Sequence, residues 1–384
     1  MEHFSATGEL DPNANIQFGE GGAGTFSDGK LTTRIGDELC GFVTEVFLQH
    51  GAPEEIAWKQ KPHVGTDLLR GVITSIRKEI EALGGEVHFN TALTGFEQKN
   101  GALNGIFTTS GAFACEALVF AVGHSARDTF GMLMDGGFVL ECKPFSVGFR
   151  AEHLQSEIEK SLYHEAAGHP ALPRGEYQLS QHVGERCVYT FCMCPGGYVV
   201  NASSEEGGLA VNGMSYSGRD GKNANSAIIV SVTPKDFGSE HPLAGIEFQR
   251  KLEEKAYQAG GGKIPVQRYG DFREIVSGNR RDSRSGQETE QTTGKVQENR
   301  WIEQEVAENT EKLQPQCKGE YAWADLSGIL PQECNHAFVD GMTSFGHQIK
   351  GFDREDAILL GVESRTSSPV RILRDGASLQ ADIE

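Results

Sequence analysis

The chain has 384 residues, enough to bury one or two substantial cores, and its 54 acidic and 35 basic side chains give a formal net charge of −19. This acidic balance argues against a nucleic-acid partner and against an anionic membrane surface, because both need a basic surplus. A chain of this length needs no disulfide framework, so we interpret the eight cysteines as mostly reduced thiols and expect a cytoplasmic protein.

The N-terminal part shows neither the basic start nor the apolar stretch of a secretory signal, and no apolar run approaches the roughly 20 residues that cross a bilayer. Residues 15–36 are rich in glycine, and Gly19–Gly24 formally matches GxGxxG. That fingerprint needs a buried strand before it and a helix after it, and neither flank fits. Two readings stay open: a generic turn, or a loop that lies on a cofactor, where backbone N–H groups and the side chains of Thr25, Ser27 and Lys30 are donors.

The next elements follow in close order. The spacing of apolar residues within 38–50 predicts a short helix. Thr66 or Asp67 is the expected N-cap of a longer amphipathic helix, and Gly84-Gly85 ends it with one glycine in a left-handed conformation. We then expect a strand at 87–91, and a hairpin of strands 93–98 and 103–109 that turns through Asn100-Gly101.

Residues 117–122, Ala-Leu-Val-Phe-Ala-Val, are typical of a strand buried on both faces. Gly123 follows at once, and its lack of a side chain lets the backbone approach a planar ligand closely. His124 then stands at the carboxyl end of the strand, where open α/β sheets bind ligands. It is either a hydrogen-bonded structural residue or a functional one.

From about residue 140 the pattern changes to short strands separated by glycine-rich turns, at 145–150, 188–193, 198–202 and 227–232. These predict a mainly antiparallel β substrate domain inserted into the first domain, and a mixed α/β (α+β) fold class. The expected domains are 1–139; 140–277, the inserted domain; 278–312, a polar linker, insertion or solvated helix; and 313–384, a return to the substrate domain and to the first domain.

Two further segments carry chemistry. Cys192–Gly197 reads first as a strand end with a Pro-Gly-Gly turn, although such a turn can also expose a redox-active thiolate at Cys192 or Cys194. Residues 363–371 place four hydroxyl groups and two guanidinium groups in nine positions, which suits an anionic ligand or a carboxylate substrate. No zinc-ligand spacing is present in the sequence, so we expect no metal.

Five motifs together resemble an uncharacterised family of bacterial FAD-dependent dehydrogenases in the glutathione-reductase-like FAD/NAD(P)-binding superfamily. The matching residues are Asn15–Arg34, Lys61–Asp67, Ala121–Phe130, Cys192–Gly197 and Glu363–Ile372. The resemblance covers nearly the whole chain except 278–312. It implies that 1–139 is a partial FAD-binding three-layer domain, to which 313–384 returns in part. It also implies that this chain lacks the N-terminal GxGxxG unit and the C-terminal segment that closes on the flavin, and it leaves open whether this chain alone binds FAD.

The resemblance also implies a function: hydride transfer between an unknown small molecule and FAD in the full-length parent protein. The alternatives are a non-catalytic binding remnant of a flavoprotein, and a flavin/thiol redox enzyme that uses Cys192 and Cys194. We expect His124 and Arg365 to be catalytic. The implied cofactor-binding residues are Gly21, Gly22, Gly24, Thr25, Phe26, Ser27, Lys30, Leu93, Ala121, Val122, Gly123 and His124, and the implied substrate-binding residues are Arg365, Thr366, Ser367 and Ser368.

Overall fold

The computed structural model describes residues 4, 7–17, 19–26, 29–31, 36–59, 62–99, 102–278 and 313–381. Its helices and 3-10 turns are η1 (Ala23–Phe26), α2 (Leu39–Gln49), η2 (Glu54–Ala57), α3 (Thr66–Ala82), α4 (Arg127–Asp135), α5 (Gln155–Tyr163), η3 (His164–Ala166), α6 (Pro234–Phe237), α7 (Ala244–Gly260), α8 (Tyr269–Val276) and α9 (Gln332–Gln348). Its strands are β1 (Leu93–Lys99), β2 (Ala102–Thr108), β3 (Gly111–Ala114), β4 (Leu140–Cys142), β5 (Phe145–Leu154), β6 (Ser180–Val183), β7 (Arg186–Cys194), β8 (Tyr198–Asn201), β9 (Val211–Met214), β10 (Asn223–Val232), β11 (Ile264–Arg268), β12 (Cys317–Lys318), β13 (Tyr321–Trp323), β14 (Ile358–Glu363) and β15 (Val370–Ile372).

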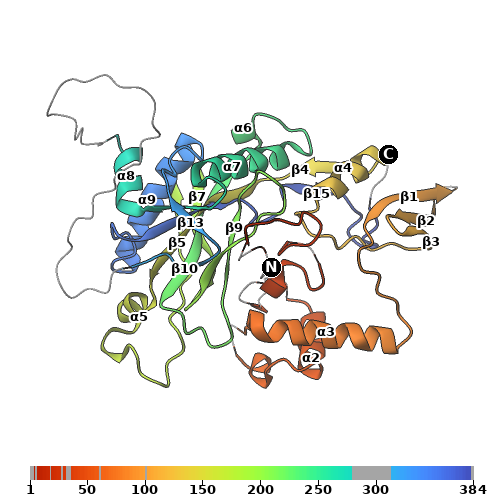
Figure 1. The fold of residues 1–384 in the computed structure, drawn as a ribbon, viewed down its shortest axis with the longest axis horizontal. Helices are drawn as coiled ribbons and strands as arrows, with labels where there is room; N and C mark the ends of the chain where they lie inside the picture. Colours follow the sequence, from red (N-terminus) through yellow and green to blue (C-terminus); the bar gives the residue numbers. More distant parts are fainter. Residues whose placement is uncertain are drawn as a thin grey trace.

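A seven-stranded sheet forms the centre of the molecule, in the order β13-β11-β14-β5-β10-β7-β6 (Figure 1). All its neighbouring strands are antiparallel except β11 and β13. The two central strands, β5 and β10, pair through ten residues each. The strands predicted at 145–150, 188–193, 198–202 and 227–232 are therefore confirmed, and the C-terminal β14 returns into the same sheet.

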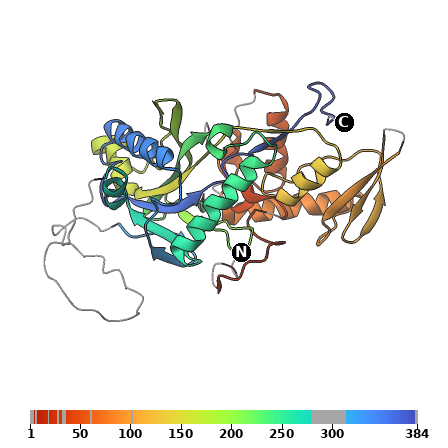
Figure 2. The ribbon, with the colours of Figure 1, turned by 90° about the horizontal axis from the view of Figure 1, so that it is seen from above.

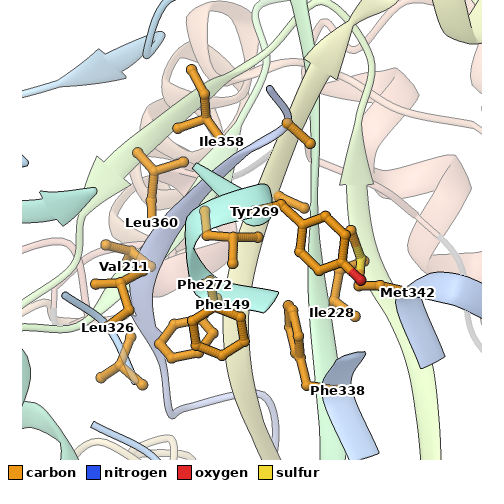
Figure 3. Packing of buried hydrophobic residues seen from close by; sticks show 14 of the residues in the cluster. Phe149, Val211, Ile228, Tyr269, Phe272, Leu326, Phe338, Met342, Ile358 and Leu360 are labelled. Carbon is orange, nitrogen blue, oxygen red and sulfur yellow. The ribbon is translucent and has the colours of Figure 1, made fainter. Parts of the chain in front are cut away.

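One face of this sheet is apolar and packs against helices α7, α8 and α9. Alternate residues of β5 point to this face, and Phe149 meets Phe272 of α8 and Phe338 of α9 with ring centroids 5.5 Å apart in each pair. Figure 3 shows these rings together with Ile228 of β10. Every residue of β5 is buried, which requires a cover on the opposite face as well.

The opposite face is polar, although it is also buried. The alternate residues Ser146, Gly148, Arg150 and Glu152 of β5 point to it, following the period of two along a strand. A second sheet, β12-β8-β9, lies over this face, and its Gly213 comes so close that an added methyl group would overlap the guanidinium of Arg150. A layer of buried polar side chains therefore separates the two sheets.

The N-terminal part forms smaller units. Leu69 and Val72 of α3 pack with Ile56 and with Phe47 of α2, so the two predicted helices are confirmed. The N-cap of α3 is Gly65 rather than Thr66 or Asp67, because the Asp67 carboxylate instead accepts hydrogen bonds from Ser217. Gly84 has φ +90, which agrees with the predicted helix ending.

The predicted hairpin is also confirmed, and β3 extends it to the sheet β1-β2-β3; its turn, Asn100-Gly101, lies outside the described residues. Figures 1 and 2 place this sheet at the opposite end of the molecule from α8 and α9. It packs on the segment that follows α4, where the rings of Phe96 and Phe138 lie 5.1 Å apart.

Two predicted strands are wrong. Residues 87–91 and 117–122 run without strand pairing, and Val119 is 87% exposed. A strand buried on both faces needs hydrogen-bonded neighbours and covering elements, and among the described residues none pairs with these two segments. The mixed α/β class is nevertheless confirmed. No helix of the described residues is both long and apolar enough to cross a membrane.

Candidate functional site

Segments that are far apart in the sequence meet beside the central sheet. Ser125 donates a hydrogen bond to the side chain of Gln17 at 3.2 Å and accepts one from Arg365, also at 3.2 Å. The ammonium group of Lys30 donates to the carbonyl of Met193, and His63 pairs with Lys30 in an isolated β-bridge. All five motifs singled out in the sequence are therefore linked by direct contacts.

One network of polar contacts is centred on Glu253 of α7, and we call this network the Glu253 cluster. The carboxylate accepts two hydrogen bonds from Arg127 at 2.8 and 3.0 Å, and two from Arg365 at 2.7 and 2.9 Å. Ser364 donates a fifth at 2.7 Å. The remaining members are Ser125, Ser204, Glu205 and Gln249, which contact one or both of the two arginines.

The ionisation of the cluster follows from burial and from these contacts. Burial alone would raise the pKa of Glu253, but Arg365 and Arg127 outweigh it and lower the pKa to about 2. The adjacent His124 has its pKa lowered to about 4, first by burial and then by the positive charges of Arg365 and Arg127. At neutral pH a neutral imidazole therefore lies beside two guanidinium groups and an ionised carboxylate.

The predicted cofactor residues of the glycine-rich segment form a loop that ends in the 3-10 turn η1, beside α3. Gly21 and Gly22 have positive φ values of +81 and +60, and a methyl group added to Gly22 or Gly24 would meet no atom of the described residues. The hydroxyl of Thr25 is buried, and no residue in the described part of the chain is a hydrogen-bond partner for it. Phe26 closes η1, and Ser27 lies outside the described residues.

The other predicted cofactor residues are spread more widely. Leu93 opens β1 and pairs with Thr108 in the outlying sheet. Ala121, Val122 and Gly123 are exposed, because the strand expected there does not form. Gly123 has φ +74 with open space around it, and the next residue, His124, is mostly buried.

The Nδ1 atom of His124 is likewise buried, and the residues that the structure describes offer it no hydrogen-bond partner. Buried polar atoms in native structures nearly always have a partner, so an unpaired one points to a missing ligand, water or ion. Both Thr25 and His124 are residues for which the sequence resemblance implies cofactor contact.

The predicted substrate residues are largely engaged with the protein itself. Arg365 is paired with Glu253 through two hydrogen bonds and donates to two serines. Thr366 donates to the carbonyl of Ser146, and Ser368 bonds the backbone of Val370. Ser367 is half-buried between them. Binding of an anion by Arg365 therefore stays a prediction that requires Arg365 to exchange one of its partners.

A second buried network, which sequence reasoning missed, lies between the two sheets around Arg150. The guanidinium is fully buried and each of its five N–H donors has a partner. These partners are Asn225 at 2.9 Å, Glu363 at 2.8 Å, Asn212 at 3.4 Å, the carbonyl of Cys192 at 2.6 Å and the sulfur of Cys194 at 3.7 Å. We call these residues the Arg150 cluster.

The sequence did contain a signal for this layer. Polar residues alternate with apolar ones through Ser146-Val147-Gly148-Phe149-Arg150-Ala151-Glu152. Such alternation usually marks a strand with one face in solvent, so it gives no reason to expect burial. Glu253 and Arg127 gave no comparable signal, since they are 126 positions apart in the chain and meet only through tertiary packing.

Comparison with known proteins agrees with this arrangement. The profile of the family "FAD-dependent protein, C-terminal domain-like" matches residues 144–299 and 280–366, which hold the central sheet and most of both clusters. An uncharacterized protein of Clostridium beijerinckii is 44% identical over 385 residues, a match that covers 99% of this chain and 67% of that protein. The chain belongs to this family of FAD-dependent proteins.

Proposed function

We propose that this chain forms the substrate-facing part of an FAD-dependent oxidoreductase, in which a hydride passes between a small organic substrate and the flavin. FAD, when bound, would accept or deliver that hydride. The observation that carries the proposal is that direct contacts link all five motifs, three of which meet at the Glu253 cluster while the other two are joined through Lys30, in a chain whose family is FAD-dependent.

The residues present fit a flavin in two respects. The Thr25 hydroxyl and the His124 Nδ1 atom are buried and have no hydrogen-bond partner among the described residues, and a flavin ring with its ribityl chain carries both donors and acceptors. Gly22, Gly24 and Gly123 leave open space where any other residue would carry a side chain. We assign Thr25 and His124 to hydrogen bonds with the cofactor.

In this proposal Arg365 orients and binds rather than transfers protons. Its two hydrogen bonds with Glu253 fix the guanidinium, while its Nη1 atom contacts only the neutral hydroxyls of Ser125 and Ser204. A substrate carboxylate could replace one of these hydroxyls and gain a charge-assisted hydrogen bond. His124, neutral at pH 7, would be the nearby group able to accept a proton at a ring nitrogen.

The alternative is a flavoprotein-derived binding module without catalysis. It predicts FAD binding with no turnover of the bound flavin by any substrate class. Amines, 2-hydroxy acids and quinones, offered to the FAD-loaded protein under anaerobic conditions while the flavin absorbance is followed, separate the two cases.

Titration with FAD, followed by visible absorbance and flavin fluorescence, tests the cofactor assignment. In Thr25→Val the unpaired hydroxyl is removed, so the unfolding free energy should stay equal or rise by up to roughly 1–3 kcal/mol. Loss of one hydrogen bond of about 1 kcal/mol to the flavin should weaken FAD binding about fivefold.

Thr74→Val is the matched control, because the Thr74 hydroxyl bonds the Arg70 carbonyl on the same side of the molecule, at α3. FAD affinity should not change in this variant. The proposal fails if neither this chain nor the longer Clostridium beijerinckii relative forms a yellow complex with FAD.

A further inference from the structure

The Cys192-Met193-Cys194 segment forms an irregular end of strand β7. Phe191 pairs with Ala227 of β10 and Cys194 pairs with Asn225, so that two residues of β7, Cys192 and Met193, stand opposite one residue of β10. Cys192 itself has φ +45, a conformation that a non-glycine residue rarely adopts. This is a β-bulge, a feature that redirects side chains and is often found beside active sites.

The bulge brings the two thiols together. The Cys194 thiol donates a hydrogen bond to the Cys192 carbonyl at 3.3 Å, and the Cys192 side chain is among the groups that raise the pKa of this thiol. Even in a fully extended chain, residues two apart have Cα atoms no more than about 7 Å apart, close to the upper end of the span of about 4.4–6.8 Å that a disulfide bridges. Reduced in this structure, the pair can therefore close into a disulfide without long-range movement of the backbone.

The Arg150 cluster holds this bulge in place. Arg150 donates to the Cys192 carbonyl at 2.6 Å and to the Cys194 sulfur at 3.7 Å, and its other three donors are fixed by Glu363, Asn212 and Asn225. A fully buried guanidinium paired with one carboxylate is costly unless all its hydrogen bonds are made. Here all of them are made, two of them to the cysteine segment.

The two thiols differ in the way an attacking and a resolving cysteine differ. Cys192 is half-buried, whereas Cys194 is fully buried. The hydrogen bond with Cys192 and the burial of the thiol raise the pKa of Cys194 well above the usual range, so Cys194 keeps its proton in the resting state. The charges that face the pair are Arg150, Lys30 and Glu363, and the first two favour a thiolate.

We propose that Cys192 and Cys194 form a redox-active dithiol whose substrate is an aliphatic disulfide. The Cys192 thiolate attacks one sulfur of the disulfide, its S–S bond breaks, and the first thiol leaves with a proton. Cys194 then gives up its proton and attacks the Cys192 sulfur, the mixed disulfide breaks, and the second thiol leaves. Two electrons pass from the protein to the disulfide, which yields the Cys192–Cys194 disulfide and two thiols.

This proposal does not depend on the flavin, so it is tested on the complete chain without FAD. The protein is incubated with glutathione disulfide, quenched with acid, and analysed by intact mass and peptide mapping. The wild type should lose two thiols and two hydrogen atoms, with a linked Cys192–Cys194 peptide and no retained glutathione.

Single variants separate the two roles. Cys194→Ser should stop at one glutathionyl group on Cys192, because the resolving thiol is missing. Cys192→Ser should form neither adduct nor link at this segment. Cys187→Ser, which changes another half-buried cysteine of β7, should behave as the wild type does. The proposal is overturned if Cys192 reacts no faster than Cys187, or if Cys194→Ser accumulates no adduct on Cys192.

Alkylation rates test whether the charge of Arg150 favours the Cys192 thiolate, and they do so without involving the disulfide substrate. Burial raises the pKa of Glu363 to about 7, so above this pH Glu363→Gln keeps the shape of the hydrogen-bonded partner of Arg150 and removes its negative charge. The pH profile of Cys192 alkylation should then shift to lower pH, because the unneutralised guanidinium favours the thiolate. A purely structural role for Glu363 leaves that profile where it is. A pulse of iodoacetamide on the wild type, read at Cys192 and Cys187, gives the reactivity ranking even if a variant fails to fold.

Discussion

Glu253 offers the most quantitative test of the structure. Its carboxylate accepts five hydrogen bonds, four of them from Arg127 and Arg365, and its side chain is 1% exposed. Lowering the pKa from the model-compound value of 4.5 to about 2 corresponds to roughly 3 kcal/mol of stabilisation at neutral pH, at 1.36 kcal/mol for each unit.

We therefore expect Glu253→Gln to lower the unfolding free energy by about 3–5 kcal/mol, the usual loss when one partner of a buried ion pair is removed. Two guanidinium groups would then face one another with a single remaining carboxylate, that of Glu205. The measurement is urea denaturation at pH 7, followed by far-UV circular dichroism. Glu254→Gln is the matched control on the same helix, where the side chain is exposed and a change within about 0.5 kcal/mol is expected.

The pH dependence of unfolding gives a second test of the stabilisation by Glu253. Because the pKa of Glu253 is lower in the folded protein than in the unfolded chain, the unfolded chain binds the extra proton between about pH 4.5 and 2. The stabilisation is complete above pH 4.5 and is lost as the pH falls toward 2, so the difference between wild type and Glu253→Gln should narrow over this interval. A loss below about 1 kcal/mol at pH 7, or a difference that widens in acid, would refute the ion-pair reasoning.

Two further predictions concern the buried polar layer between the two sheets, and a third concerns residues 117–122, where the sequence predicts a strand that the structure does not have. Burial raises the pKa of Glu152 to about 8, so between about pH 4.5 and 8 the carboxyl is protonated in the folded protein and ionised in the unfolded chain. The free energy of unfolding therefore falls as the pH rises through this interval. In urea denaturation between pH 5 and 8, the unfolding free energy of Glu152→Gln should rise relative to that of the wild type. In Gly213→Ala the new methyl group overlaps the guanidinium of Arg150, and a loss of about 1–3 kcal/mol is expected, whereas Gly71→Ala in α3, where nothing lies within 4 Å, should be neutral or stabilising by up to about 1 kcal/mol. Val119→Asp should change the unfolding free energy of this chain by less than about 0.5 kcal/mol, because the side chain is exposed. A loss of several kcal/mol would instead show that residues 117–122 are buried, as the sequence predicts.

Local patterns of the sequence determined much of the fold. The apolar spacing of α3 and the glycine pair after it predict both the helix and its end, because a helix period and a left-handed glycine are properties of neighbouring residues. The hairpin β1–β2 and the strands β5, β7, β8 and β10 follow from the same kind of short-range pattern.

Tertiary structure alone decided what is buried. Residues 117–122 have the composition of a core strand, yet they are largely exposed, because burial depends on neighbouring strands and the described residues supply none. Arg150 and Glu152 have the alternation of a solvent-facing strand, yet they are fully buried, because a second sheet lies over them. The contacts of Arg127 and Arg365 with Glu253 join three distant parts of the chain, and such contacts depend on packing that no local sequence pattern specifies.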